Sequence, residues 1–162
     1  MKSVIIGLGN PIVGDDAIGI KVVEYIRDTL SLPENTEVLA DISIAGVGLV
    51  ELFRGFDKVI LIDSIQSGTY PIGKVLLLKP DQFSLAIHSS DYHNMDLFTA
   101  LEFSNQMYDD IPEIIKIIGI EIISPMEFSE ELSIDLGKKF DDIVSEVYKL
   151  IIQELSEEIK QK

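Results

Sequence analysis

The chain has 162 residues, which fits one folded domain, and its 46% hydrophobic and 25% charged residues are typical of globular proteins. The formal net charge of −15 argues against binding to nucleic acids or to anionic membranes, which both attract clustered Lys and Arg. The lack of cysteine excludes disulfides, cysteine-ligated zinc and thiol catalysis. The apolar run at the N-terminus is broken by glycine too early for a secretion signal, so we expect a cytoplasmic protein.

The first half of the chain alternates predicted strands and helices. Residues 2–9 form a β-branched apolar run that ends in glycine, which predicts a buried strand. An amphipathic helix is predicted from Asp16 until Pro33 stops it, because apolar residues recur at four-residue spacing. Next in order are a strand over 36–42, a short helix over 46–55 and a central strand over 57–65.

The second half begins with a fourth strand over 73–80 and a loop over 81–93. It continues with a helix over 94–107, a strand over 113–122 and a long helix from Ile134 to about Ile159. The segment 66–72 is too short for a helical crossover, so the fourth strand is predicted to be antiparallel. We predict a single α/β domain over residues 1–162, a three-layer α/β/α sandwich with a five-stranded, mixed but mostly parallel sheet.

A glycine-rich loop, GLGNPIVGDDAIG at residues 7–19, follows the first strand. Gly7 and Gly9 match the dinucleotide-binding fingerprint, but Ile12 stands at the third glycine position and the paired aspartates would repel a pyrophosphate. Asp41 ends the second strand, where a ribose-binding acid would stand. A nucleotide-binding domain therefore stays as the least favoured alternative.

Asp15 and Asp16 stand together at the predicted start of the first helix. An acid there can cap the helix and interact well with its dipole, but both cannot easily cap the same end. We assign Asp15 to the cap and leave Asp16 free for another role.

Asp63 ends the predicted third strand. An acid is costly to bury there without a partner, and this edge is where open α/β sheets bind ligands. The alternative is that Asp63 caps a turn with Ser64 or Ser67.

The only histidines, His88 and His93, lie in the loop before the helix at 94–107. Each alone is most simply a surface residue or lies near a helix cap. Because the first and third strands end at one edge of the sheet, Asp16, Asp63 and one histidine can converge there. Two carboxylates and an imidazole suit a divalent metal, and three protein ligands leave positions open for substrate or water.

With these residues in place, nearly the whole chain resembles the hydrogenase maturation proteases, endopeptidases that trim the C-terminal tail from the large subunit precursor of nickel–iron hydrogenases. The matching positions are Gly7, Gly9, Asn10, Asp15, Asp16, Ala17, Gly19, Asp63, His93, Gly119-Ile120-Glu121 and Leu132-Ser133. The family's phosphorylase/hydrolase-like fold agrees with the predicted sandwich. Peptidyl-tRNA hydrolases share GLGNP at residues 7–11, but residues 12–30 hold no histidine and the charge is unsuited to tRNA.

The resemblance implies that Asp16, Asp63 and His93 are the catalytic residues and the metal ligands. The implied metal is nickel carried by the precursor, which the protease recognises as a sign that the hydrogenase active site is complete. The implied enzyme is an aspartic-type endopeptidase whose partner is the large subunit precursor, and we expect it to be a monomer. Members often have Glu where Asp16 stands and a different turn in place of DISIAG at 41–46.

Two mechanisms stay open from the sequence. A bound divalent ion polarises the scissile carbonyl or activates a water. Alternatively, the metal only positions the precursor, and Asp16 or Asp63 acts as a general base. In either case His93 must be neutral to bind metal, so binding weakens as the pH falls. The rival function is a non-catalytic, nickel-sensing chaperone or scaffold that uses the same ligands.

Overall fold

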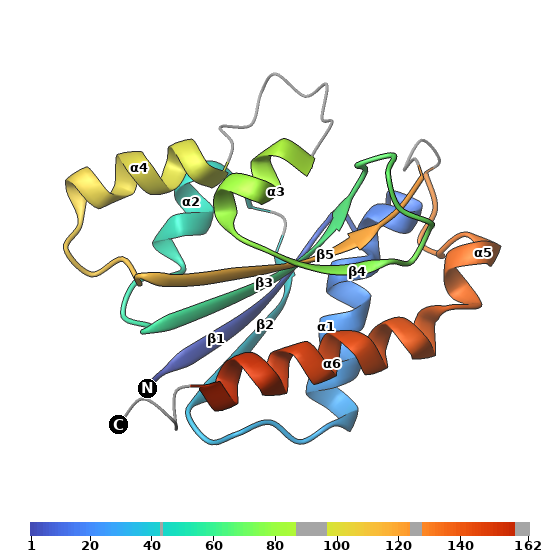
Figure 1. Cartoon of the computed structure of the whole chain (residues 1–162), viewed down its shortest axis with the longest axis horizontal. Helices are drawn as coiled ribbons and strands as arrows, with labels where there is room; N and C mark the ends of the chain where they lie inside the picture. The colour runs from blue at the N-terminus through green and yellow to red at the C-terminus, as the bar shows by residue number, and fades with distance from the viewer. Residues whose placement is uncertain (43, 87–96, 124–127, 158–162) are drawn as a thin grey trace.

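The computed structural model describes residues 1–42, 44–86, 97–123 and 128–157, and its five-stranded sheet has the order β2-β1-β3-β5-β4 (Figure 1). The strands are β1 (Ser3–Leu8), β2 (Thr36–Ile42), β3 (Lys58–Ile65), β4 (Val75–Leu78) and β5 (Ile114–Glu121). The helices are a 3-10 helix η1 (Gly14–Ala17), then α1 (Ile18–Thr29), α2 (Gly46–Glu51), α3 (Pro80–Ala86), α4 (Leu97–Met107), α5 (Ile134–Gly137) and α6 (Phe140–Ser156).

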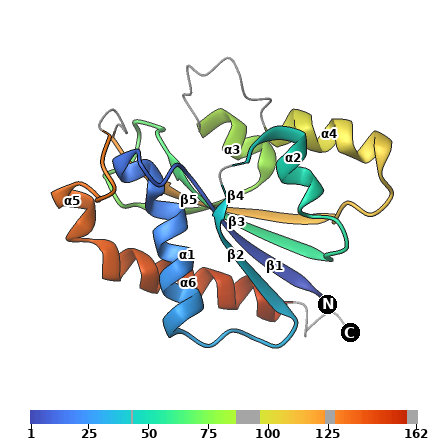
Figure 2. The same ribbon diagram turned by 180° about the vertical axis from the view of Figure 1, so that it is seen from behind.

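Helices cover both faces of the sheet. α2, α3 and α4 lie on one face, and α1, α5 and α6 lie on the other, as seen from the front in Figure 1 and from behind in Figure 2. β1 pairs in parallel with β2 and β3, and β3 pairs in parallel with β5. β4 runs antiparallel to β5, as the short segment 66–72 predicted. The predicted α/β/α sandwich with a mixed sheet is therefore confirmed.

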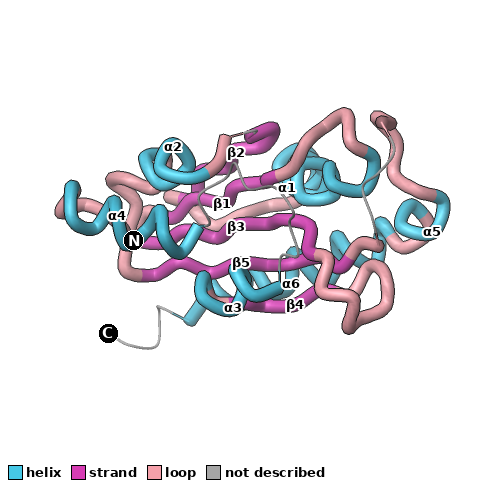
Figure 3. The backbone as a smooth tube through the Cα atoms, turned by 90° about the horizontal axis from the view of Figure 1, so that it is seen from above, coloured by secondary structure: helices cyan, strands magenta, loops and turns pink. Residues whose placement is uncertain are grey.

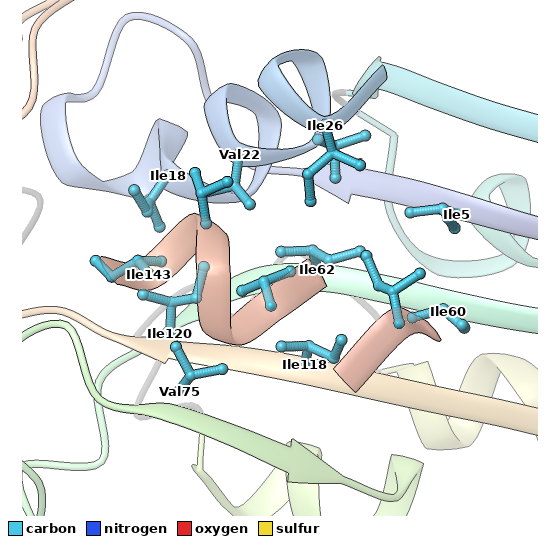
Figure 4. Packing of buried hydrophobic residues seen from close by; sticks show 14 of the residues in the cluster. Ile5, Ile18, Val22, Ile26, Ile60, Ile62, Val75, Ile118, Ile120 and Ile143 are labelled. Atoms are coloured by element: carbon cyan, nitrogen blue, oxygen red, sulfur yellow. The ribbon is translucent and has the colours of Figure 1, made fainter. Parts of the chain in front are cut away.

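The core sits on both sides of the three inner strands β1, β3 and β5. Successive side chains of a strand point to opposite faces, so a strand buried on both faces must be apolar throughout. In β3, Ile60 and Ile62 pack with residues of α1 and α6, whereas Leu61 and Ile65 pack with residues of α2 and α4. Figure 4 shows the first of these clusters, in which isoleucines from three strands meet the apolar face of α1.

The prediction of a loop over 81–93 is wrong for its first part, because Pro80–Ala86 form α3. The helix begins with proline at its first position, and the backbone N–H of Lys79 donates to Oε1 of Gln82 at 2.9 Å. Phe83 is buried and holds the helix against the sheet. Residues 87–96 lie outside the described residues.

The other differences concern helix boundaries. The first helix is preceded by η1, so α1 begins at Ile18 rather than Asp16, and it ends at Thr29 before reaching Pro33. The predicted long last helix is two helices, and Lys139 between them has φ −100° and ψ 0°. The break follows Gly137, which has a low helix propensity. The apolar spacing continues across the break, so the sequence pattern gives no sign that the helix is interrupted.

β1, β3 and β5 are parallel, so their carboxyl ends lie at the same edge of the sheet, which Figure 3 shows from above. The turn into α1, the loop after β3 and the segment after β5 all start from this edge. In the described part of the chain, every helix is too short or too polar to cross a bilayer.

Candidate active site

The turn between β1 and α1 is packed so closely that it requires glycine. Gly9 has a φ of +142°, and a Cβ at this position would clash with the backbone oxygen of Asp16. Gly19 in the first turn of α1 has no room for a Cβ, because the carbonyl oxygens of Leu8 and Ile62 fill that space. These contacts bring the start of α1 against the ends of β1 and β3, and they place Asp16 there.

The Asp16 carboxylate is held by a donor on each oxygen. The backbone N–H of Asn10 donates to Oδ2 at 3.0 Å, and the hydroxyl of Ser64 donates to Oδ1 at 2.8 Å. Asn10 also shapes the turn, because its Oδ1 accepts from the backbone N–H of Ile12 at 3.2 Å. Two donors fix the orientation of the carboxylate, and each oxygen keeps lone-pair capacity for another partner.

Asp63 lies near the carboxyl end of β3, next to the serine that binds Asp16. The backbone N–H of Ser64 donates to Oδ1 of Asp63 at 2.7 Å, so Ser64 bridges the two carboxylates. Asp63 keeps some exposure to solvent. Burial of its carboxyl nevertheless raises the pKa to about 8, the charge of Asp16 adds to the rise, and the Ser64 N–H acts against it.

This pair of carboxylates has the chemistry of a cation site. Among the described residues, neither Asp16 nor Asp63 forms an ion pair with Lys or Arg. A divalent cation would offset the repulsion that contributes to the raised pKa of Asp63, and carboxylate oxygens suit such ions. The described ranges contain no group of three or more His, Cys, Asp or Glu side chains placed to hold a metal ion. His88 and His93 lie outside these ranges, so the predicted histidine ligand stays a prediction.

The predicted role of Asp15 as the cap of its own helix is wrong. Neither η1 nor α1 has a side-chain cap. Asp15 is buried instead, and it accepts from the backbone N–H of Ser133 at 2.7 Å and from its hydroxyl at 2.8 Å. Ser133 is the N-cap of α5, since its Oγ accepts from the N–H of Leu136 at 3.3 Å. Asp15 thus joins the glycine loop to a segment 118 residues further along the chain.

A second buried carboxylate, Glu121, holds the loop after β3. Glu121 is 2% exposed, and it accepts from the hydroxyl of Ser67 at 2.7 Å and from the N–H of Gly68 at 2.9 Å. The alternative role of Asp63 as a turn cap with Ser67 is not observed, because the Ser67 hydroxyl binds Glu121, and Ser64 lies within β3 rather than in a turn. Sequence reasoning missed the bonds from Ser64 to Asp16, from Ser67 to Glu121 and from Ser133 to Asp15, although the family motifs already included Glu121 and the Leu132-Ser133 pair.

The fold and the site together define an α/β/α protein with a pair of bridged aspartates at the carboxyl edge of its sheet. The family model of the hydrogenase maturation proteases matches residues 20–154. The chain therefore belongs to this family, as its motifs predicted, and it is a hydrolase of the endopeptidase class.

Individual relatives agree with this assignment. The hydrogenase 2 maturation protease of Escherichia coli K12 is 27% identical over 124 residues, which cover 74% of this chain and 73% of that protein. A putative hydrogenase maturation protease of Methanocaldococcus jannaschii is 28% identical over 152 residues, which cover 90% of this chain and 96% of that protein. The fold is similar to that of the hydrogenase maturating endopeptidase HybD from E. coli, with a TM-score of 0.75 and 22% identity. The match covers 95% of this chain and 94% of that protein.

Proposed function

We propose that this protein removes the C-terminal extension from the large subunit precursor of a nickel–iron hydrogenase after nickel has been inserted. The observation that carries the proposal is the pair of aspartates, Asp16 and Asp63, bridged by Ser64 in a member of this family. Nickel arrives with the precursor and is part of the substrate. Asp16, Asp63 and His93 would bind this nickel, so the protease would recognise whether the precursor carries the metal.

The residues of the site support hydrolysis as well as recognition. With a pKa of about 8, the Asp63 carboxyl holds a proton at neutral pH while no cation is bound. Approach of a cation favours release of that proton, and the carboxylate then ligates the ion or accepts a proton from the attacking water. Ser64 keeps both carboxylates in one orientation during this change. A bound divalent ion would polarise the scissile carbonyl or lower the pKa of the attacking water.

The test is cleavage of the precursor in its nickel-loaded and nickel-free forms, followed by intact-mass spectrometry. We expect loss of the extension from the loaded form alone, and no loss with the Asp16→Asn or Asp63→Asn variant. Equal cleavage of both forms would contradict nickel recognition. Tight binding of the loaded precursor with the extension still attached would identify a chaperone or scaffold instead.

A further inference from the structure

A segment near the C-terminal part of the chain crosses the glycine-rich turn. Residues 128–133 directly precede α5 and lie beside the turn that leads into α1 (Figures 1 and 2). The N–H of Gly14 donates to the carbonyl of Ser129 at 2.7 Å, and the N–H of Ser129 donates to the carbonyl of Ile12 at 3.0 Å. We call residues 128–133 the strap. Its first part is therefore held to the main chain of the turn.

The last residue of the strap binds a side chain of the turn. The N–H of Ser133 donates to Oδ1 of Asp15 at 2.7 Å, and its hydroxyl donates to Oδ2 at 2.8 Å. Asp15 is only 7% exposed, and in the described part of the chain it forms no ion pair with Lys or Arg. A carboxylate with so little exposure needs donors for its charge. Ser133 supplies one donor to each oxygen, so this contact is costly to break.

Asp15 and Asp16 are consecutive residues of η1, which is a single turn of 3-10 helix, so their side chains leave the turn in different directions. The strap holds Asp15, whereas the N–H of Asn10 and the hydroxyl of Ser64 hold Asp16 at 3.0 and 2.8 Å. A turn that is held by two adjacent side chains cannot rotate without breaking one set of bonds. The strap therefore restricts the orientation in which η1 presents the Asp16 carboxylate.

We propose that Asp15 is a positioning residue, whose bonds to Ser133 hold Asp16 in the orientation that binds the cation and so set the affinity of the site. The inference rests on the proposed function, in which Asp16 is a ligand of the nickel ion. Groups behind the ligands of a metal control its affinity, because they fix the orientation of the ligands before the ion arrives. Without the strap, binding of the ion would also have to restrict the motion of Asp16.

The test measures the Kd for Ni²⁺ by isothermal titration in the wild type and in Ser133→Ala, Ser133→Thr and Ser129→Ala. Ser129→Ala is the matched control, because in the described residues the Ser129 hydroxyl bonds only to main-chain atoms of Glu131, inside the strap, at 3.0 Å. We expect Ser133→Ala to raise the Kd about fivefold or more, and the other two variants to stay within about twofold of the wild type.

A double-mutant cycle separates this role from a general loss of stability. Asp15→Asn should weaken nickel binding by itself, and Ser133→Ala should add little in that background, because the contact is already impaired. A defect that only loosened the fold would act equally in both backgrounds. Nickel should also slow amide hydrogen exchange over residues 128–137 in the wild type but not in Ser133→Ala, because coupling between two sites is reciprocal.

Equal Kd values for the wild type and Ser133→Ala would overturn the inference. Equal weakening by Ser129→Ala, or a wild type that binds no nickel by itself, would overturn it as well. Failure of the proposed function is distinguished from these outcomes by cleavage of the nickel-loaded precursor. A wild type that cleaves nothing, but loses nickel affinity in Ser133→Ala and not in Ser129→Ala, would contradict the proposed function and support the positioning role of Asp15.

Discussion

The carboxyl of Asp63 gives the cation-free protein a distinctive pH dependence. Its pKa is raised from 3.8 to about 8, so between these values the native state keeps a proton that the unfolded state has lost. The native state then binds more protons, and the free energy of unfolding falls as the pH rises through this range. The contribution of the protonated Asp63 carboxyl to stability is fully present below pH 3.8, and it is lost once the pH is above about 8. We expect a loss of at least about 1.4 kcal/mol, the equivalent of one pKa unit.

Denaturation by urea at about pH 5 and about pH 8 in a chelator measures this effect. The control is Asp63→Asn, which keeps an acceptor for the Ser64 N–H and has no charge to titrate. The variant should become more stable relative to the wild type as the pH rises. A difference between the two proteins that is the same at both pH values would contradict the raised pKa.

The predicted histidine ligand is tested by paired substitutions. We expect His93→Ala to abolish cleavage and to weaken binding of nickel, and His88→Ala to change neither. Wild-type affinity for nickel should rise with pH, because His93 and Asp63 must both lose a proton to bind a cation. Isothermal titration with nickel and the precursor cleavage assay give the two readouts. Loss of activity in His88→Ala alone would identify His88 as the ligand in place of His93.

Gly19 is the residue whose size sets the approach of α1 to the sheet. In Gly19→Ala the new methyl group meets the carbonyl oxygens of Leu8 and Ile62, which cannot turn aside. We expect destabilisation of about 2 kcal/mol or more, together with weaker cation binding. The control is Gly137→Ala in α5, where a Cβ meets nothing within 4 Å, and it should be neutral or stabilise by up to about 1 kcal/mol. Equal stability of the two variants, by thermal unfolding, would refute this account.

At the scale of elements, α5 depends on one side chain for both its start and its position. Ser133→Ala removes the N-cap bond to Leu136 and the hydroxyl bond to Asp15. The lost cap alone is worth about 1 kcal/mol, and the buried Asp15 loses a donor as well. We expect the variant to be about 1–3 kcal/mol less stable in denaturant. Ser133→Thr, which keeps a hydroxyl, should restore most of the loss, and failure to do so would point to a different cause.

The elements that the sequence predicted well are those whose pattern comes from burial. The middle residues of β1 and β3, 4–6 and 59–62, are all apolar because both faces of these strands are covered, and the apolar stripe of α1 faces the sheet. The helix α3 was missed because its short sequence has no complete apolar stripe. Its signal was local, with Pro80 at the first position and Gln82 two residues later, where the side chain meets the Lys79 N–H.

The whole molecule is held together across α6 by charges buried at the opposite end from the site. The Glu154 Oε2 lies 3.8 Å from Lys58 Nζ and 3.5 Å from Lys116 Nζ. Glu154 and Lys58 are almost fully buried. Glu154→Gln removes a negative charge that is buried beside Lys58 and Lys116, so we expect destabilisation of about 3 kcal/mol or more.

The matched control for this prediction is another glutamate of α6. Glu146 pairs with Lys74 at 3.9 Å, and both side chains are close to half exposed. Solvent screens such a pair, so Glu146→Gln should change the free energy of unfolding by less than about 1 kcal/mol. Similar effects of the two substitutions would show that the buried charges contribute no more than the exposed ones.

At the level of the whole molecule, the sequence was sufficient for the fold class, the family and the edge of the sheet that carries Asp16 and Asp63. It was not sufficient for the bonds that organise this edge. Ser64 stands beside Asp63 in the sequence, but its hydroxyl bond to Asp16 joins positions 48 residues apart. The same is true of Asp15 with Ser133. Such pairings leave no periodic pattern, because each depends on a single contact between distant segments.

The contact of Gly19 with the ends of β1 and β3 has a consequence for how such a protein can change. The closest approach of α1 to these strand ends is limited there by main-chain atoms, the carbonyl oxygens of Leu8 and Ile62. We expect volume-conserving exchanges of isoleucines elsewhere in the sheet to disturb the site less than a side chain at Gly19 would. Glycine at this position is therefore a stricter requirement for an intact site than the identity of any one apolar residue in the interior.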